Sequence, residues 1–152
     1  MKGKLFTTLV LLLALSACTV ATKHFWEIPS DYTPHIAMLR AHPEWGSVVI
    51  VNPIHCEKIG VDACGFFRSN AHAHYALNHQ ALPPSAYPKS MRVAADCWAA
   101  RNADPAEVYA AYLFLSDENR DAGIPITGDP LERAEVIRDC ATKAGNWRVA
   151  AK

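Results

Sequence analysis

Residues 70–79, NAHAHYALNH, hold three histidines within a run that is predicted to be helical. Such a cluster has three interpretations: a metal site, a metal site that has lost its ligands, or a polar helix rich in histidine. On a helix, His74 shares a face with position 70, whereas His72 points about 200° away from His74. His79 reaches His74 only if the helix breaks near Asn78. The residues around the histidines therefore decide which of the three interpretations applies.

The sequence on both sides predicts a mainly α-helical α+β domain with a small sheet and four or five helices. Residues 47–51, SVVIV, are β-branched and bounded by turn residues, which is typical of a strand. Residues 53–80 and 89–103 are predicted to be helical, and the three prolines of 81–88 predict a loop between them. Residues 35–41 are predicted to form a short helix that ends before Pro43.

Two further helices are predicted from a repeated start signal. DPAE (104–107) and DPLE (129–132) each place an aspartate at the N-cap, a proline at the first helical position and a glutamate at the third. These helices are expected to run to about Leu115 and Lys143, with Gly145 as a C-terminal cap.

The N-terminus, MKGKLFTTLVLLLALSACTV, has a basic start and an apolar stretch too short to span a bilayer. Its LSAC end (15–18) resembles a bacterial lipobox, which implies lipidation of Cys18, with palmitate among the expected chains. Residues 1–17 are then a signal peptide, 18–34 a lipid-proximal tether and 35–152 a single domain. The residue after Cys18 is Thr19 and not aspartate, which favours the periplasmic side of the outer membrane over the inner membrane.

Charge and cysteine content agree with export. Loss of Lys2 and Lys4 reduces the 15 basic residues to 13 against 15 acidic ones, and no basic stripe indicates nucleic acid. Four cysteines remain beside Cys18, an even number that suggests two disulfides in an oxidising compartment. Of three pairings we favour Cys56–Cys64, which closes a short turn, and Cys97–Cys140, which ties two predicted helices.

Four segments carry a resemblance to a known family: VVIVNP (48–53), ACGFFRSNAHAHYALNH (63–79), MRVAADCWAA (91–100) and GDPLERA (128–134). Together they resemble the gluzincin-type zinc metallopeptidases, whose helical HExxH motif is followed by ExxxD on a second helix. The resemblance implies a minimal zincin-like fold in which two histidines and a glutamate hold zinc. A second glutamate activates the water bound to the metal.

Most of the motif residues are replaced in this chain. By the resemblance, Asn70 stands for the first ligand histidine, Ala71 for the general base and Arg92 for the third ligand. His74, His79 and Asp96 match the second ligand, a late histidine and the aspartate that steadies a ligand. Alanine cannot accept a proton, and arginine brings a positive charge to the place of the cation.

We therefore expect a catalytically inactive pseudopeptidase that acts as a binding module in the cell envelope, anchored to the membrane by lipid. A groove for a peptide or protein partner along residues 48–51 is implied by the resemblance. Two alternatives remain: an active zinc peptidase with rearranged ligands, and a periplasmic metal-binding lipoprotein. The metal would be zinc, held by His74, His79 and Asp96, although Asp96 could instead bond Asn70 or pair with Arg92.

Overall fold

Three short strands form a mixed sheet in the computed structural model, which describes residues 26–149. The strands are β1 (Glu27–Pro29), β2 (Ala37–His42) and β3 (Gly46–Val51), in the order β1-β3-β2. The central strand β3 pairs in parallel with β1 and antiparallel with β2. Its residues Val48 and Val49 are buried, as expected for a β-branched strand with neighbours on both sides.

The structure differs from two predictions near the N-terminus. Residues 35–41, predicted to be a helix, contribute most of β2, because pairing with the whole of β3 outweighs the helix propensity of alanine, methionine and leucine. Strand β1 lies within residues 18–34, which were predicted to be a tether. Cys18 and the predicted signal peptide lie outside the described residues.

Five helices follow the sheet: α1 (Pro53–Ile59), α2 (Val61–Ala76), α3 (Lys89–Asn102), α4 (Pro105–Ser116) and α5 (Pro130–Lys143). The stretch 53–80, predicted to be mainly helical, contains two helices, because Gly60, with φ of 88°, separates α1 from α2. A 3₁₀ turn, Pro84–Ala86, lies in the predicted proline loop. The fold is therefore α+β and mainly helical, as predicted.

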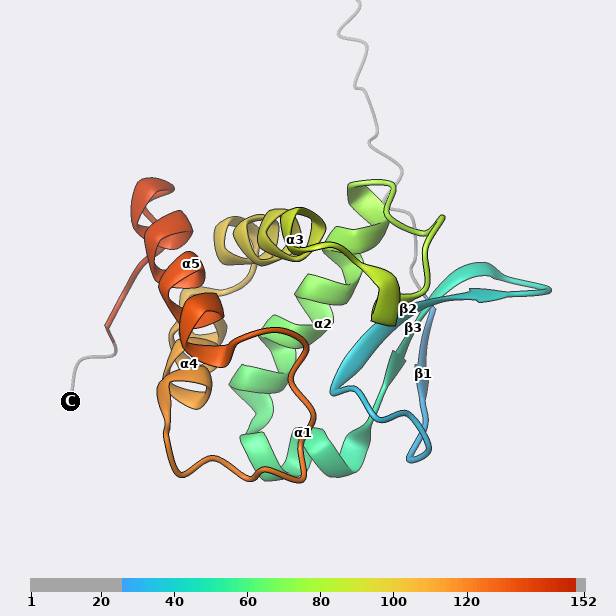
Figure 1. Ribbon diagram of the computed structural model, residues 1–152, viewed down its shortest axis with the longest axis horizontal. Coiled ribbons are helices and arrows are strands. Elements are labelled where there is room, and N and C mark those ends of the chain that lie inside the picture. The colour runs from blue at the N-terminus through green and yellow to red at the C-terminus, as the bar shows by residue number, and fades with distance from the viewer. Residues whose placement is uncertain (1–25, 150–152) are drawn as a thin grey trace, which may run out of the picture.

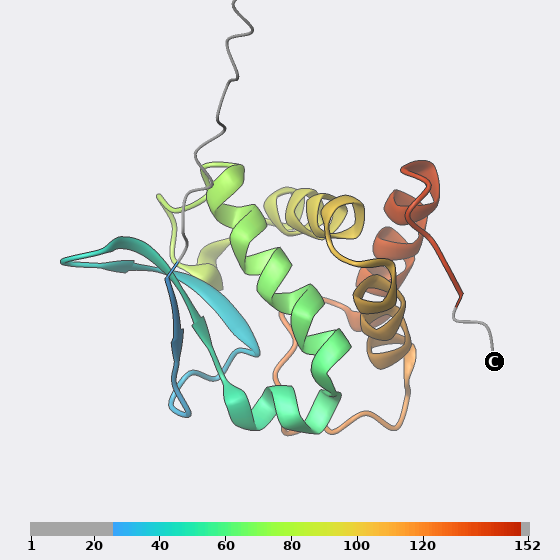
Figure 2. The ribbon, with the colours of Figure 1, turned by 180° about the vertical axis from the view of Figure 1, so that it is seen from behind.

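Helix α2 is the centre of the molecule, with the sheet on one side of it and α3, α4 and α5 on the other (Figures 1 and 2). On the helical side Phe66 packs in a core with Val108, Leu115 and Ile137, from α4 and α5. On the sheet side Ala71 packs against Leu39 and Val49. The predicted histidine helix thus forms the boundary between two small cores.

The predicted helix caps are present. Asp104 and Glu107 form a reciprocal capping box at α4, and the Asp129 side chain accepts a hydrogen bond from the Glu132 N–H at α5. At the end of α5, Gly145 has a positive φ; its N–H donates to the Thr142 carbonyl, and the Asn146 N–H donates to the Ala141 carbonyl. This is the Schellman arrangement that glycine favours.

Both predicted disulfides are present, Cys56–Cys64 and Cys97–Cys140. The first joins α1 to α2 across the corner at Gly60, and the second joins α3 to α5. Two disulfides are consistent with a location outside the cytoplasm. Within residues 26–149, no helix has the length and apolar character needed to cross a membrane.

Candidate functional site

The end of α2 brings two histidines together. The helix ends at Ala76, and Asn78 adopts a positive φ of 57°. The chain then turns back, so that the His79 N–H donates to the His74 carbonyl and the two Nδ1 atoms lie 3.0 Å apart. The prediction that a break near Asn78 would swing His79 towards His74 is confirmed. His72 points elsewhere and contacts Glu27 of β1 at 3.1 Å.

His74 is held in its neutral form. Its ring stacks on Tyr87 with centroids 4.1 Å apart, and burial, the neighbouring His79 and the charge of Arg133 lower the pKa of His74 to about 4. The Nδ1 contact needs one ring to donate and the other to accept, which two protonated rings cannot do. The pair therefore keeps its geometry only while at least one ring is neutral.

The buried His74 predicts a loss of stability in mild acid. Below pH 6.5 the unfolded chain protonates this residue, whereas the folded chain resists down to about pH 4. The free energy of unfolding should therefore fall by about 2 kcal/mol between about pH 7.5 and 5.0. Urea unfolding at the two pH values measures this loss, which His74→Asn should largely remove. An unchanged loss in that variant would contradict the assignment.

A buried ion pair lies beside the histidines. Asp96, which is 1% exposed, accepts hydrogen bonds from Arg133 Nε at 2.8 Å and Nη2 at 2.7 Å. Asn70 Nδ2 donates to the same carboxylate at 2.8 Å, as the sequence allowed. Burial opposes the charge of Arg133, but the charge and hydrogen bonds of Asp96 outweigh it and raise the pKa of Arg133. Asp96 is thus engaged by a cation and an amide of the protein itself.

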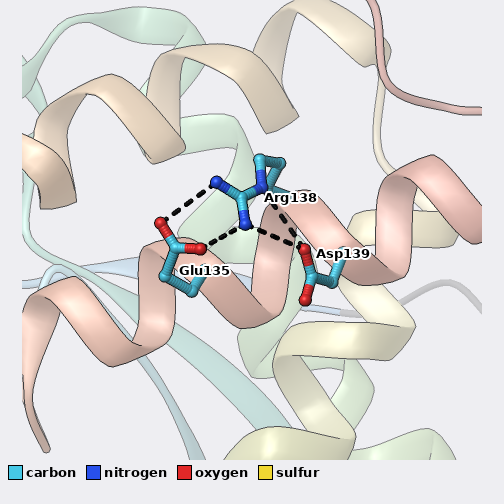
Figure 3. Close-up of polar contacts among 3 residues, drawn as sticks. All are labelled: Glu135, Arg138 and Asp139. Atoms are coloured by element: carbon cyan, nitrogen blue, oxygen red, sulfur yellow. Dashed lines mark hydrogen bonds and ion pairs between the residues drawn. The ribbon is translucent and has the colours of Figure 1, made fainter.

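The predicted pairing of Asp96 with Arg92 is wrong, because Arg133 reaches the carboxylate from α5. Arg92 instead donates from Nη1 to the Tyr87 carbonyl. Farther along α5, Arg138 pairs with Glu135 and Asp139 on the outside of the molecule (Figure 3). That exposed cluster resembles many surface ion pairs, which contribute little to stability.

A cleft runs along β2 in two adjoining parts, which share His35, Met38, Leu39, Pro84 and Tyr87. The inner cavity, of about 60 Å³, brings together side chains from α2, α3 and the loop before α5: Phe67, Asn70, Ala71, His74, Arg92 and Ile126. The outer cavity, of about 430 Å³, continues to Arg40 and Ala41 beside residues 80–85. We call the two cavities together the β2 cleft.

Within residues 26–149, the backbone of β2 has hydrogen-bonding groups at its outer edge that no other strand pairs with. Val49 bonds towards β1, through its N–H to the Trp26 carbonyl, so the residues on either side of it bond towards β2. The Asn52 N–H also donates to the Ile36 carbonyl, so the even-numbered residues at this end of the pairing are the ones that bond between the two strands. Since such a ladder alternates, the N–H and C=O groups of Ala37, Leu39 and Ala41 point away from β3.

The partner strand predicted along residues 48–51 has no free edge to pair with at β3. Strand β3 is central and has a partner at both edges, so it cannot accept another strand. Strand β2 is an edge strand, and Ala37, Leu39 and Ala41 all lie along the cleft.

The three side chains predicted to bind a metal, His74, His79 and Asp96, contact other protein groups in the structure. His74 and His79 bond each other, while the two oxygens of Asp96 face Arg133 and Asn70. From residue 26 to residue 149, no three His, Cys, Asp or Glu side chains are grouped so that they could hold a metal ion. Among the part of the chain that the structure describes, the residues that line the β2 cleft include no aspartate or glutamate that could act as a general base.

The structure brings Asn70, Ala71, His74 and Arg92 to one cavity, as the aligned motif positions require. Sequence reasoning did not assign roles to Tyr87 and Arg133. Arg133 lies in the GDPLERA segment (128–134), one turn into a helix with a clear N-cap. That place in the sequence was the signal from which its position near the site could have been inferred. Tyr87 lies in a proline-rich loop, where periodicity gives no indication of contacts.

Comparisons with known proteins give no family for this chain. No family model matches it, and neither the curated proteins nor the solved structures include a significant match.

Proposed function

We propose that this protein is a lipid-anchored, non-catalytic module of the bacterial cell envelope that binds an extended polypeptide segment along β2. The observation that carries the proposal is the open edge of β2, with the backbone groups of Ala37, Leu39 and Ala41 along a cleft. A partner strand gains main-chain hydrogen bonds at such an edge, and its alternate side chains enter the cleft.

The residues of the β2 cleft support binding over hydrolysis. Ala71 stands where the resemblance expects a base, and Arg92 stands where it expects a ligand for zinc. An arginine in the inner cavity repels a divalent cation, and the Asp96–Arg133 pair fixes the neighbouring charge inside the protein. The pseudopeptidase interpretation rests on these side chains together with the sequence resemblance.

The proposed location rests on other observations. Two disulfides suit an oxidising compartment, and the LSAC sequence before Thr19 is typical of a lipidated, exported chain. Lipid at Cys18 would hold the domain close to a membrane surface. Thr19, which follows Cys18, favours the outer membrane over the inner membrane. Mass analysis of the N-terminal peptide from cells checks the acylation directly.

The peptide-binding proposal is tested with an extended probe, the acetylated and amidated heptapeptide Thr-Val-Thr-Glu-Thr-Val-Thr. We expect saturable binding to the full chain, and a loss of at least about tenfold in affinity for Ala41→Pro. Proline removes an N–H that points into solvent and leaves the β2–β3 ladder intact. Calorimetric titration measures the affinity.

The matched control is Arg40→Pro, one residue away. The Arg40 N–H points towards β3, so this variant should lose ladder hydrogen bonds and become less stable to heat, whereas Ala41→Pro should not. Equal peptide affinity of Ala41→Pro and the wild type would contradict binding at this edge. Zinc-dependent cleavage of the probe would contradict the non-catalytic assignment.

A further inference from the structure

The β2 cleft has a one-sided charge. Arg40, Arg92 and Arg133 line it, and none of the described residues that line it is acidic. The charge of Arg133 is balanced by Asp96 at 2.7 Å. Arg40 is exposed and alternates with Leu39, so it belongs to the opposite face of the strand from the floor formed by α2. Arg92 is therefore the cationic side chain of the inner cavity that could bind a ligand.

Arg92 is held in place by a neutral group. It also lines a small cavity with Asp96, Asp129 and Glu132, but Asp96 pairs with Arg133 and Glu132 pairs with Lys89. Nη1 donates to the Tyr87 carbonyl, a neutral acceptor, and no ion pair among residues 26–149 includes Arg92. Its Nε lies 3.3 Å from the place that a Cβ on residue 128 would occupy. Gly128 thus gives the guanidinium room, and the remaining N–H groups are available to a ligand.

We propose that Arg92 binds an acidic side chain of the extended segment that occupies the β2 cleft. The inference rests on the proposed function and adds to it the chemical class of the partner: a segment with aspartate or glutamate at the residue that faces α2 and α3. A guanidinium holds a carboxylate through two parallel hydrogen bonds, which gives orientation as well as affinity. Arg92 would thereby recognise an anion from the position that the resemblance assigns to the third zinc ligand.

The position of Arg92 favours a side chain over a chain terminus. Arg92 comes from α3 and lines the inner cavity with Asn70 and His74 of α2, below the strand edge. In a segment paired with Ala37, Leu39 and Ala41, every second side chain points to that floor. The cleft also continues past Leu39 to Ala41, so the segment can cross it.

The test compares three peptides on the full chain: the heptapeptide above, the same peptide with glutamine in place of glutamate, and the glutamine peptide with a free C-terminal carboxylate. We expect the glutamate peptide to bind at least about tenfold more tightly than the glutamine peptide. Arg92→Gln should remove this preference. Arg101→Gln, an exposed arginine later on α3, is the matched control and should keep it.

A second readout comes from His74, which lines the same cavity. A bound carboxylate favours the charged imidazole, so the glutamate peptide should raise the pH midpoint of the His74 ring signals and the glutamine peptide should not. This shift reports the charge of the ligand in the inner cavity. It would not follow from a purely structural effect of Arg92.

The outcomes separate the two proposals. Equal binding of the glutamate and glutamine peptides overturns the role of Arg92 and leaves binding at the β2 edge in place. Preference for the free C-terminal peptide assigns Arg92 to a chain terminus and also overturns this inference. Failure of all three peptides to bind contradicts the proposed function itself.

Discussion

Asp96→Asn is expected to lower the free energy of unfolding by about 3–5 kcal/mol, the largest effect of any single substitution considered. Arg133 is 13% exposed, and its Nε and Nη2 both donate to Asp96. Asparagine keeps the size of the side chain but leaves a buried cation without a counter-ion. Urea unfolding monitored by circular dichroism at neutral pH measures the loss.

The double variant Asp96→Leu/Arg133→Met is the control. Removal of both charges should recover at least half of the loss, because a buried ion pair is often replaceable by apolar residues of similar volume. It also gives a measurable protein if Asp96→Asn fails to fold. A loss below about 1 kcal/mol for Asp96→Asn would show that the pair does not hold α3 and α5 together.

Removal of the Cys97–Cys140 disulfide, by alanine at both positions, should cost about 4 kcal/mol. Its cysteines are 43 residues apart, so in the unfolded chain the bond closes a long loop. The same change at Cys56 and Cys64, which are 8 residues apart, should cost about 2.5 kcal/mol. Thermal unfolding of both variants under non-reducing conditions gives the comparison.

The order of the two effects is the informative result. If the short-loop variant is the less stable one, chain entropy is not the main contribution, and the corner between α1 and α2 must depend on Cys56–Cys64 in the folded state. The cavity left by each pair of alanines affects both variants in the same direction.

The helices were largely predictable because their signals are local. The DP dipeptides at 104 and 129 carry their own capping chemistry, and Gly145 needs no distant contact to end α5. Strand β2 was not predictable in this way. Residues 37–42 have helix-favouring side chains, and only the presence of β3 alongside makes them a strand. Gly60 was the visible signal for the break that the prediction missed.

Part of the candidate site was predictable: the approach of His79 to His74 and the bond from Asn70 to Asp96 were both expected, whereas the ion pair of Asp96 with Arg133 was not. Asn70, Ala71, His74 and Arg92 meet at one cavity, as the resemblance implied. The partner of Asp96 comes from 37 residues later in the chain, so helical spacing pointed to Arg92 instead of Arg133. Which strand has a free edge depends on the order β1-β3-β2, which a single predicted strand cannot reveal.

The candidate site is held together by contacts between the protein's own side chains. Arg133 supplies a fixed positive charge next to Asp96, and His74 and His79 hold each other. These contacts engage His74 with His79 and Asp96 with Arg133 beside the β2 cleft, whereas Arg92 and the edge of β2 are its proposed binding groups.

Amide hydrogen exchange along β2, with and without the heptapeptide, tests the central claim most directly. In the free protein the amides of Ala37, Leu39 and Ala41 should exchange fast, and those of Met38, Arg40 and His42 slowly. The peptide should slow exchange at Ala37, Leu39 and Ala41. Saturating peptide that leaves these three amides unprotected would contradict a binding module built on the edge of β2.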